Sequence, residues 1–167
     1  NSLLHNDILE SYTHLMVMKS ISKSYGVPGL RLGVFASSDK ALIARIRKEV
    51  SIWNINSFAE FYLQIYGKYE NDYKRACEKF IAERETFYEE LKSIPYLRVF
   101  PSKANYFMCE VIDKYTSAEL TQRLIDNDVL ISNCGLKRNM SGRQLIRLAV
   151  RSREDNSRLV NILKALA

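Results

Sequence analysis

The stretch at 18–33 constrains the fold and the chemistry of this chain more than any other part of the sequence. It places Lys23 among small hydroxyl residues. Eight residues later, Arg31 follows a Gly-Val-Pro-Gly turn. Short apolar runs at 15–18 and 32–36 predict a buried strand on each side of the turn. A guanidinium fork and short hydroxyl donors suit a phosphate dianion. The stretch therefore combines an amine with a phosphate site. The alternative is an ordinary glycine turn with a surface lysine.

The same stretch resembles the lysine motif of fold-type I (aspartate aminotransferase-like) pyridoxal phosphate enzymes. That motif reads roughly Ser/Thr-x-Ser-Lys-x-Tyr/Phe-Gly-x-x-Gly-x-Arg-x-Gly. The matching residues are Ser20, Ser22, Lys23, Tyr25, Gly26, Gly29, Arg31 and Gly33. The resemblance implies that Lys23 forms a Schiff base with pyridoxal 5'-phosphate and then moves the substrate α-proton. It also implies that Ser20, Ser22 and Arg31 hold the cofactor phosphate. For the two serines the alternative is a hydroxyl that bonds local backbone, and for Tyr25 it is simple packing.

A second arginine, Arg147, lies inside the predicted strand at 145–150 among alternating apolar residues. A charged side chain in a half-buried strand needs an anionic partner. In the resembling family an arginine of this strand binds the substrate α-carboxylate, or the equivalent end of the substrate, which implies that role for Arg147. A structural ion pair to Asp or Glu is the alternative. Residues 102–107 are similar to the family's Ser-x-x-Asn-Phe/Tyr strand entry, which implies that Asn105 faces the substrate carboxylate.

The resemblance covers essentially the whole chain and is best to the histidinol-phosphate aminotransferase and threonine-phosphate decarboxylase branch. Residues 53–57 resemble the Pro-x-Asn-x-Asn-Ser stretch of that branch. Within it, Asn56 has an alternative role as the cap of the next helix. For Trp53 the alternative is a core or dimer-interface aromatic.

Two departures from that branch leave the substrate open. Ser132 stands on the predicted strand where members commonly have an arginine that contacts the substrate, although Lys137 or Arg138 in the following loop offers a replacement charge. After the strand that carries Arg147, the aminotransferases tend to have Gly-Thr. This chain has Arg151 and Ser152 there, which is closer to the decarboxylase-like relatives.

Apolar periodicity and capping signals predict an α/β fold in two parts. We expect helices at about 39–50, 57–66, 71–94, 117–127 and 153–166. Ser38 caps the first of these, a Thr116–Glu119 capping box begins the fourth, and Ser152 caps the last. We expect strands at 98–100, 106–111, 129–132 and 145–150. The second part resembles a small α/β sandwich, while two strands in the first part are too few for an independent sheet. The resemblance therefore implies the C-terminal portion of the PLP-dependent transferase fold. Residues 1–70 would end the large cofactor-binding domain, and 71–167 would form the linking helix and the small domain.

The function implied by the resemblance is that of an aminotransferase for an amino acid or amino-phosphate substrate, homodimeric in the full-length protein. Other cofactor contacts of the family precede this segment, including the aspartate that pairs with the pyridinium nitrogen. We therefore expect this chain alone to have little or no activity and the parent protein to be the enzyme. The alternatives are a decarboxylase of a phosphorylated amino acid on the same scaffold, or a truncated, non-catalytic module.

Composition and charge argue against other classes of protein. The net charge is +6, but lysines and arginines are spread along predicted helices with acids between them, so we expect no nucleic-acid partner. Cys77, Cys109 and Cys134 are widely spaced, which argues against a disulfide or zinc framework and favours a cytoplasmic protein. His5 and His14 lie outside any ligand spacing, so we expect no metal site. No apolar run approaches the ~20 residues needed to span a membrane, and the start lacks signal-peptide zones.

Overall fold

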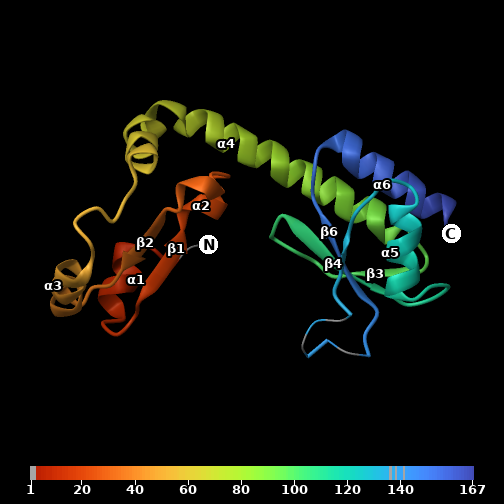
Figure 1. Ribbon diagram of the computed structural model, residues 1–167, viewed down its shortest axis with the longest axis horizontal. Coiled ribbons are helices and arrows are strands. Elements are labelled where there is room, and N and C mark those ends of the chain that lie inside the picture. Colours follow the sequence, from red (N-terminus) through yellow and green to blue (C-terminus); the bar gives the residue numbers. More distant parts are fainter. Residues whose placement is uncertain (1–2, 136, 138, 141) are drawn as a thin grey trace. The chain divides into compact units, whose positions relative to one another are not determined.

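The computed structural model describes residues 3–135, 137, 139–140 and 142–167 (Figure 1). They form two compact units, one up to Lys74 and one from Arg75 onward. The boundary lies inside the long helix α4 (Ser57–Lys92), so one continuous helix contributes residues to both units. In the part of the chain that the structure describes, no helix combines the length and the apolar character needed to cross a membrane.

The first unit contains an antiparallel strand pair joined by a structured connection. Strand β1 (Val17–Ser20) pairs with β2 (Gly33–Ala36) along the whole length of both. The connection folds into the one-turn helix α2 (Ile21–Ser24) and the 3₁₀ turn η1 (Pro28–Leu30). One strand on each side of the glycine turn is confirmed, but β1 begins two residues later than predicted, and no residue of either strand is buried. The pairing brings the ends of the lysine motif together.

Two other helices of this unit differ from the sequence prediction. Helix α1 (Asn6–Ser11) has no counterpart in it. Helix α3 (Lys40–Glu49) is capped by Asp39, whose carboxylate accepts a hydrogen bond from the Leu42 amide at 2.9 Å. The predicted cap, Ser38, was wrong by one residue. Aspartate and serine are equally good caps, so composition alone does not decide between neighbours.

Helix α4 is one helix of 36 residues, whereas the sequence pattern predicted two, with a break around residue 67. Gly67 lies in the expected break, but glycine costs only about 1 kcal/mol in a helix and does not interrupt its hydrogen bonds. The residues around it favour helix, and Lys74 pairs with Glu70 one turn apart at 2.8 Å. The amide oxygen of Asn56 accepts from the Ala59 nitrogen at 2.9 Å, which confirms the alternative role of Asn56 as the cap.

The second unit is an antiparallel sheet in the order β3-β4-β6-β5 with helices packed on it. Its elements after α4 are β3 (Leu97–Val99), β4 (Tyr106–Val111), α5 (Ser117–Ile125), β5 (Ser132–Asn133), β6 (Leu145–Ala149) and α6 (Arg153–Ala165). The capping box of Thr116 and Glu119 is confirmed, and so is Ser152 as the cap of α6. The strand predicted at 129–132 is wrong in extent, because pairing with β6 begins only at its last residue, Ser132.

The core of the second unit lies between one face of this sheet and its helices. The largest side chains that are fully buried there include Phe87, Leu91, Phe107, Leu120, Leu124, Ile146, Leu148 and Leu163. Because side chains alternate along a strand, the residues between the buried ones face the other side of the sheet. Arg147 and Ala149 are exposed on that outer face. This confirms the expected small α/β sandwich with helices on one face.

Candidate functional site

Lys23 lies in the one-turn helix α2, with its side chain exposed. The preceding Ser22 is buried, with 2% of its surface exposed. Its hydroxyl oxygen accepts a hydrogen bond from the Leu32 amide at 2.7 Å, and the hydroxyl donates to the Leu32 carbonyl at 3.2 Å. Ser22 therefore attaches the lysine helix to the residue that leads into β2.

The Ser22 contact matches the alternative interpretation, a hydroxyl that bonds local backbone. A hydroxyl carries one hydrogen, and Ser22 gives it to Leu32, so it has none to donate to a phosphate in this arrangement. The contact of Ser22 with a cofactor phosphate stays a prediction, for which its geometry is less suited than that of Ser20. Ser20 is exposed at the end of β1, and its side chain does not cap α2.

Arg31 follows the 3₁₀ turn in a left-handed backbone conformation, with φ 53° and ψ 39°. This conformation is uncommon outside glycine and turns the chain sharply before β2. The guanidinium is exposed and makes one long hydrogen bond, at 3.4 Å to the Pro28 carbonyl. Among the described residues it has no carboxylate partner. Ser20 thus ends β1, and Lys23 and Arg31 lie on the connection that follows, so this segment offers a hydroxyl, an amine and a guanidinium to an anionic ligand.

Arg147 lies on the outer face of the second unit's sheet, directly between Met108 of β4 and Ser132 of β5. It is exposed, and its guanidinium carbon lies 5.3 Å from the centre of the Tyr106 ring. Within the described residues no carboxylate pairs with it, so the alternative of a structural ion pair finds no support there. The expectation of a half-buried strand is confirmed, because Ile146 and Leu148 are buried while Arg147 and Ala149 are exposed on the other face.

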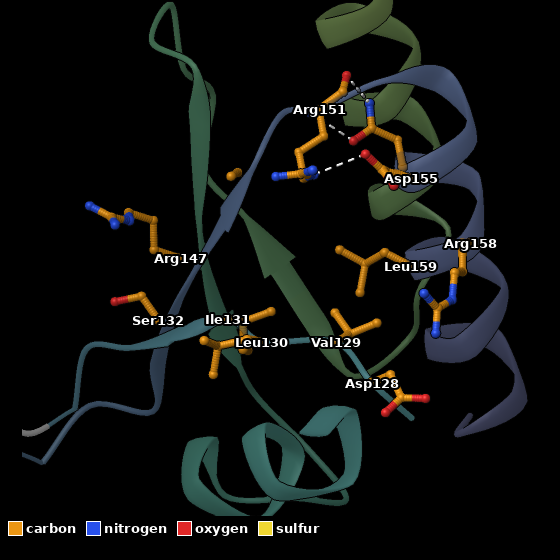
Figure 2. Close-up of a pocket in the computed structure, with 12 residues that line it drawn as sticks. Asp128, Val129, Leu130, Ile131, Ser132, Arg147, Arg151, Asp155, Arg158 and Leu159 are labelled. Carbon is orange, nitrogen blue, oxygen red and sulfur yellow. Dashed lines mark hydrogen bonds and ion pairs between the residues drawn. The ribbon is translucent and has the colours of Figure 1, made fainter. Parts of the chain in front are cut away.

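A cavity of about 600 Å³ opens beside Arg147 (Figure 2). Its lining comes from the segment that leads into β5 and the first residue of β5, from alternate residues of β6, from the link between β6 and α6, and from α6: Asp128, Val129, Leu130, Ile131, Ser132, Arg147, Ala149, Arg151, Asp155, Asn156, Arg158 and Leu159. The Arg151 guanidinium is held by Asp155 at 2.9 Å, and Arg158 donates to the Asn127 carbonyl at 3.0 Å. Of the three arginines that line the cavity, Arg147 is therefore the one whose guanidinium has neither an ion pair nor a hydrogen bond among the described residues.

Asn105 is exposed directly before β4, and its carbonyl accepts from the Val150 amide at 2.9 Å. The turn before it is attached to α4 through Arg84, which is buried and donates to the Lys103 carbonyl at 3.0 Å. Arg84 also pairs with Glu85 at 2.8 Å. These contacts fix the backbone that presents Asn105.

Sequence reasoning missed Arg84, although a signal was present. Arg84 follows Phe80 by four residues and precedes Phe87 by three, so it falls on the same helix face as two residues of the core. A cation on an apolar helix face indicates a buried partner. Of the two proposed replacement charges after Ser132, Lys137 is exposed, and Arg138 lies outside the described residues.

Comparison with known proteins places these features in a family context. The family model described as aminotransferase class I and II matches residues 5–163. The chain is 32% identical to the threonine-phosphate decarboxylase of Salmonella typhimurium over 93% of the chain and 42% of that protein. It superimposes with a TM-score of 0.82 on the histidinol-phosphate aminotransferase from Clostridium acetobutylicum, at 27% identity, covering 95% of this chain and 47% of that one. A decarboxylase from Sulfurospirillum multivorans gives the same TM-score, at 26% identity, 99% coverage of this chain and 47% of that one. The chain thus spans less than half the length of each of these proteins.

Proposed function

The chain belongs to the class I and II aminotransferase family, and on that premise we propose that the whole protein is an aminotransferase for an amino acid or amino-phosphate substrate. Enzymes of this family depend on pyridoxal 5'-phosphate. The observation that carries the proposal is the segment from the end of β1 to the start of β2, which carries Ser20, Lys23 and Arg31, and Arg31 has no carboxylate partner among the described residues.

The donor set of this connection fits pyridoxal phosphate. When bound, the cofactor withdraws electrons from the substrate Cα and so stabilises negative charge there. Lys23 supplies the amine that bonds the cofactor and later carries the proton to or from the substrate Cα. The Ser20 hydroxyl and the Arg31 guanidinium bind the phosphate, since both donate hydrogen bonds that suit a dianion. Ser22 contributes by holding α2 to Leu32.

The substrate contacts belong to the second unit in this proposal. Arg147 binds the substrate carboxylate, because its guanidinium is exposed on the outer face of the sheet beside a cavity of about 600 Å³. Asn105 adds a side-chain amide from the neighbouring turn. Residues 1–70 correspond to the end of the large cofactor-binding domain, and 71–167 to the linking helix and the small domain.

A second candidate is a decarboxylase of a phosphorylated amino acid. Its support is the 32% identity to the threonine-phosphate decarboxylase of Salmonella typhimurium. The two reactions need the same lysine and differ in which bond of the substrate Cα stands perpendicular to the cofactor ring. Product analysis separates them. A keto acid with transfer of the amine supports the aminotransferase, and carbon dioxide supports the decarboxylase.

We also propose a cytoplasmic homodimer for the whole protein. Cys77, Cys109 and Cys134 are free thiols, as a reducing compartment maintains. Burial raises the pKa of Cys109 to about 12, which makes it an unreactive core residue. Ile52 and Trp53 are 93% and 90% exposed in the first unit, so they are free in this structure to contact a further surface. Sedimentation of the whole protein measures whether it dimerises.

The decisive test is the visible absorbance of the protein after it is mixed with pyridoxal phosphate and dialysed, compared with Lys23→Ala. We expect a retained band that disappears in the variant. The measurement is made on this chain and on the full-length protein. A band restricted to the full-length protein agrees with the expectation that this chain alone is inactive. A band of equal strength in full-length Lys23→Ala contradicts the proposal.

A further inference from the structure

A cluster of tyrosines packs against the turn that follows the lysine helix. The Tyr25 ring lies 4.6 Å from that of Tyr73 and 5.0 Å from that of Tyr66, both on α4. Tyr62 extends the cluster at 6.0 Å from Tyr66. The Lys19 ammonium lies 5.9 Å from the centre of the Tyr25 ring. Such edge-to-face and offset arrangements are favourable for aromatic rings, so Tyr25 is held by α4.

The hydroxyls of the cluster are engaged as well as the rings. Tyr73 donates a hydrogen bond to the Ser24 carbonyl at 2.9 Å. Burial raises the pKa of Tyr66 to about 12, and a hydrogen bond with Tyr25 adds to the shift. The Tyr66 hydroxyl therefore stays protonated at neutral pH.

Lys23 lies between two residues that are each attached to a different element. Ser22 is bonded to Leu32, which directly precedes β2, and the carbonyl of Ser24 is bonded to Tyr73 on α4. Helix α2 has four residues, and a single turn of helix has almost no stability of its own. The direction in which the Lys23 side chain leaves the backbone thus depends on these two attachments.

We infer that Tyr73 is a positioning residue for Lys23, which it fixes by bonding the Ser24 carbonyl and packing on Tyr25. The inference rests on the proposed role of Lys23 as the amine that bonds pyridoxal phosphate. A lysine that is already oriented loses less conformational freedom when it bonds the cofactor, so the affinity for the cofactor is higher. The lysine motif contains Tyr25 but not its partner, because Tyr73 is 49 residues beyond Ser24.

The test compares Tyr73→Phe with Tyr69→Phe in the full-length protein. Both substitutions remove one tyrosine hydroxyl from α4, but Tyr69 is 56% exposed and lies outside the cluster. The first measurement is amide hydrogen exchange in the cofactor-free protein. We expect exchange in the segment 21–26 to become about fivefold faster in Tyr73→Phe, as the loss of one net hydrogen bond implies. Exchange in β2 should not change, because Ser22 keeps its bonds to Leu32.

The second measurement is the affinity for pyridoxal phosphate, with the circular dichroism of its bound absorbance band at saturation. We expect about fivefold weaker binding in Tyr73→Phe and a smaller dichroic signal per bound cofactor, whereas Tyr69→Phe keeps the values of the unchanged protein. A merely structural tyrosine would lower the melting temperature without altering the dichroism of the cofactor that remains bound. Exchange and dichroism equal to those of Tyr69→Phe would overturn the inference.

Failure of the inference and failure of the proposed function give different results. If Lys23→Ala keeps the absorbance band, the proposed function is wrong, whatever Tyr73 does. If the band depends on Lys23 but is unaffected by Tyr73→Phe, only the positioning role is wrong. Should Tyr73→Phe fail to fold, Tyr25→Leu removes the ring on which Tyr73 packs and must give the same acceleration of exchange. An unchanged rate in a folded Tyr25→Leu protein overturns the inference.

Discussion

Ser132 lies directly opposite Arg147 in the pairing of β5 with β6, and the two residues face the same side of the sheet (Figure 2). Directly opposite residues in an antiparallel pair are close enough for their side chains to interact. The small serine leaves the guanidinium of Arg147 beside the Tyr106 ring, with no second cation across the strand pair. In the branch that the chain resembles, an arginine commonly stands at this position. Position 132 is therefore one at which the substrate preference of this protein can differ from that of the branch.

Replacing Arg147 by lysine should weaken the use of a carboxylate substrate. A lysine keeps the charge but loses the planar fork that binds a carboxylate through two parallel hydrogen bonds. We expect kcat/KM of the full-length protein to fall by about tenfold or more, chiefly through KM, as the loss of a charged hydrogen bond implies. The absorbance of the bound cofactor should be unchanged.

The matched control for that prediction is Arg98→Lys. Arg98 also belongs to this sheet, but its guanidinium is bonded to Glu110 at 3.2 Å. Steady-state kinetics of the two variants with one substrate decide the matter. Equal values for both would show that Arg147 does not bind the carboxylate.

Substituting Ser132 by arginine should shift preference toward substrates with two anionic groups. It places a second guanidinium across the strand pair from Arg147, at the edge of the same cavity. The two cations repel each other when one carboxylate is bound, and a second anion removes that repulsion. We expect the ratio of kcat/KM for a phosphorylated over an unphosphorylated amino acid to rise by about tenfold. Ser132→Gln, which adds length without charge, is the control, and an equal rise with it would point to size rather than charge.

Local sequence signals predicted much of the second unit but not how its site residues are supported. Strand β4 has the predicted ends, and the cap of α6 is the predicted serine, because alternation and capping depend on neighbouring residues. The contact of Arg84 with the Lys103 carbonyl joins α4 to a turn 19 residues away. The apolar helix face around Arg84 indicates a buried partner, but no pattern within either segment encodes which carbonyl that partner is. It follows from how the two segments pack.

The two serines of the lysine motif also show that a local pattern does not contain the contacts made by tertiary packing. The motif places Ser20 and Ser22 in equivalent roles, since both precede the lysine by a short interval. In the folded chain Ser22 faces inward to Leu32 and Ser20 outward, because the backbone passes from strand to helix between them. The residue types predicted a phosphate site. Which hydroxyl is free depends on pairing that a linear motif does not contain.

Ser22→Ala should destabilise the protein more than Ser24→Ala. Removing the Ser22 hydroxyl leaves the Leu32 amide and carbonyl at a buried position without this partner, which costs about 1–3 kcal/mol. Ser24 is exposed, and its hydroxyl donates to the Ser20 carbonyl at 3.1 Å, a group that water can also satisfy. Chemical denaturation of both variants gives the difference in the free energy of unfolding. Equal losses would show that burial of Ser22 does not matter.

The protein should lose stability in acid through its capping box. The Thr116 backbone amide and the Thr116 hydroxyl both donate hydrogen bonds to the Glu119 carboxylate. These bonds, the one from the amide most of all, hold the pKa of that carboxyl below its usual value of 4.5. The unfolded chain therefore takes up the proton first, and the stabilisation is complete above about pH 4.5 and is lost as the pH falls through the lowered pKa. Glu119→Gln should be less stable than the unchanged protein at pH 7, and the difference should shrink toward pH 3. Melting temperatures across this range test it. The exposed Glu78→Gln is the control, and a difference that grows in acid would contradict the sign.

Arg84 should matter for Asn105 as well as for the core. Its side chain is almost fully buried, and it holds the Lys103 carbonyl two residues before Asn105. Arg84→Met fills most of the same volume but removes the donors, so the turn before β4 loses its attachment to α4. We expect a loss of about 1–3 kcal/mol in the free energy of unfolding, as when a buried acceptor loses its partner.

Because the turn also loses its fixed position in Arg84→Met, KM for a carboxylate substrate should rise in the full-length protein. The variant Asn105→Ala should raise KM in the same way, and the double variant should add little to either, since both act through one side chain. Independent, additive effects would mean that Arg84 stabilises the second unit without orienting Asn105.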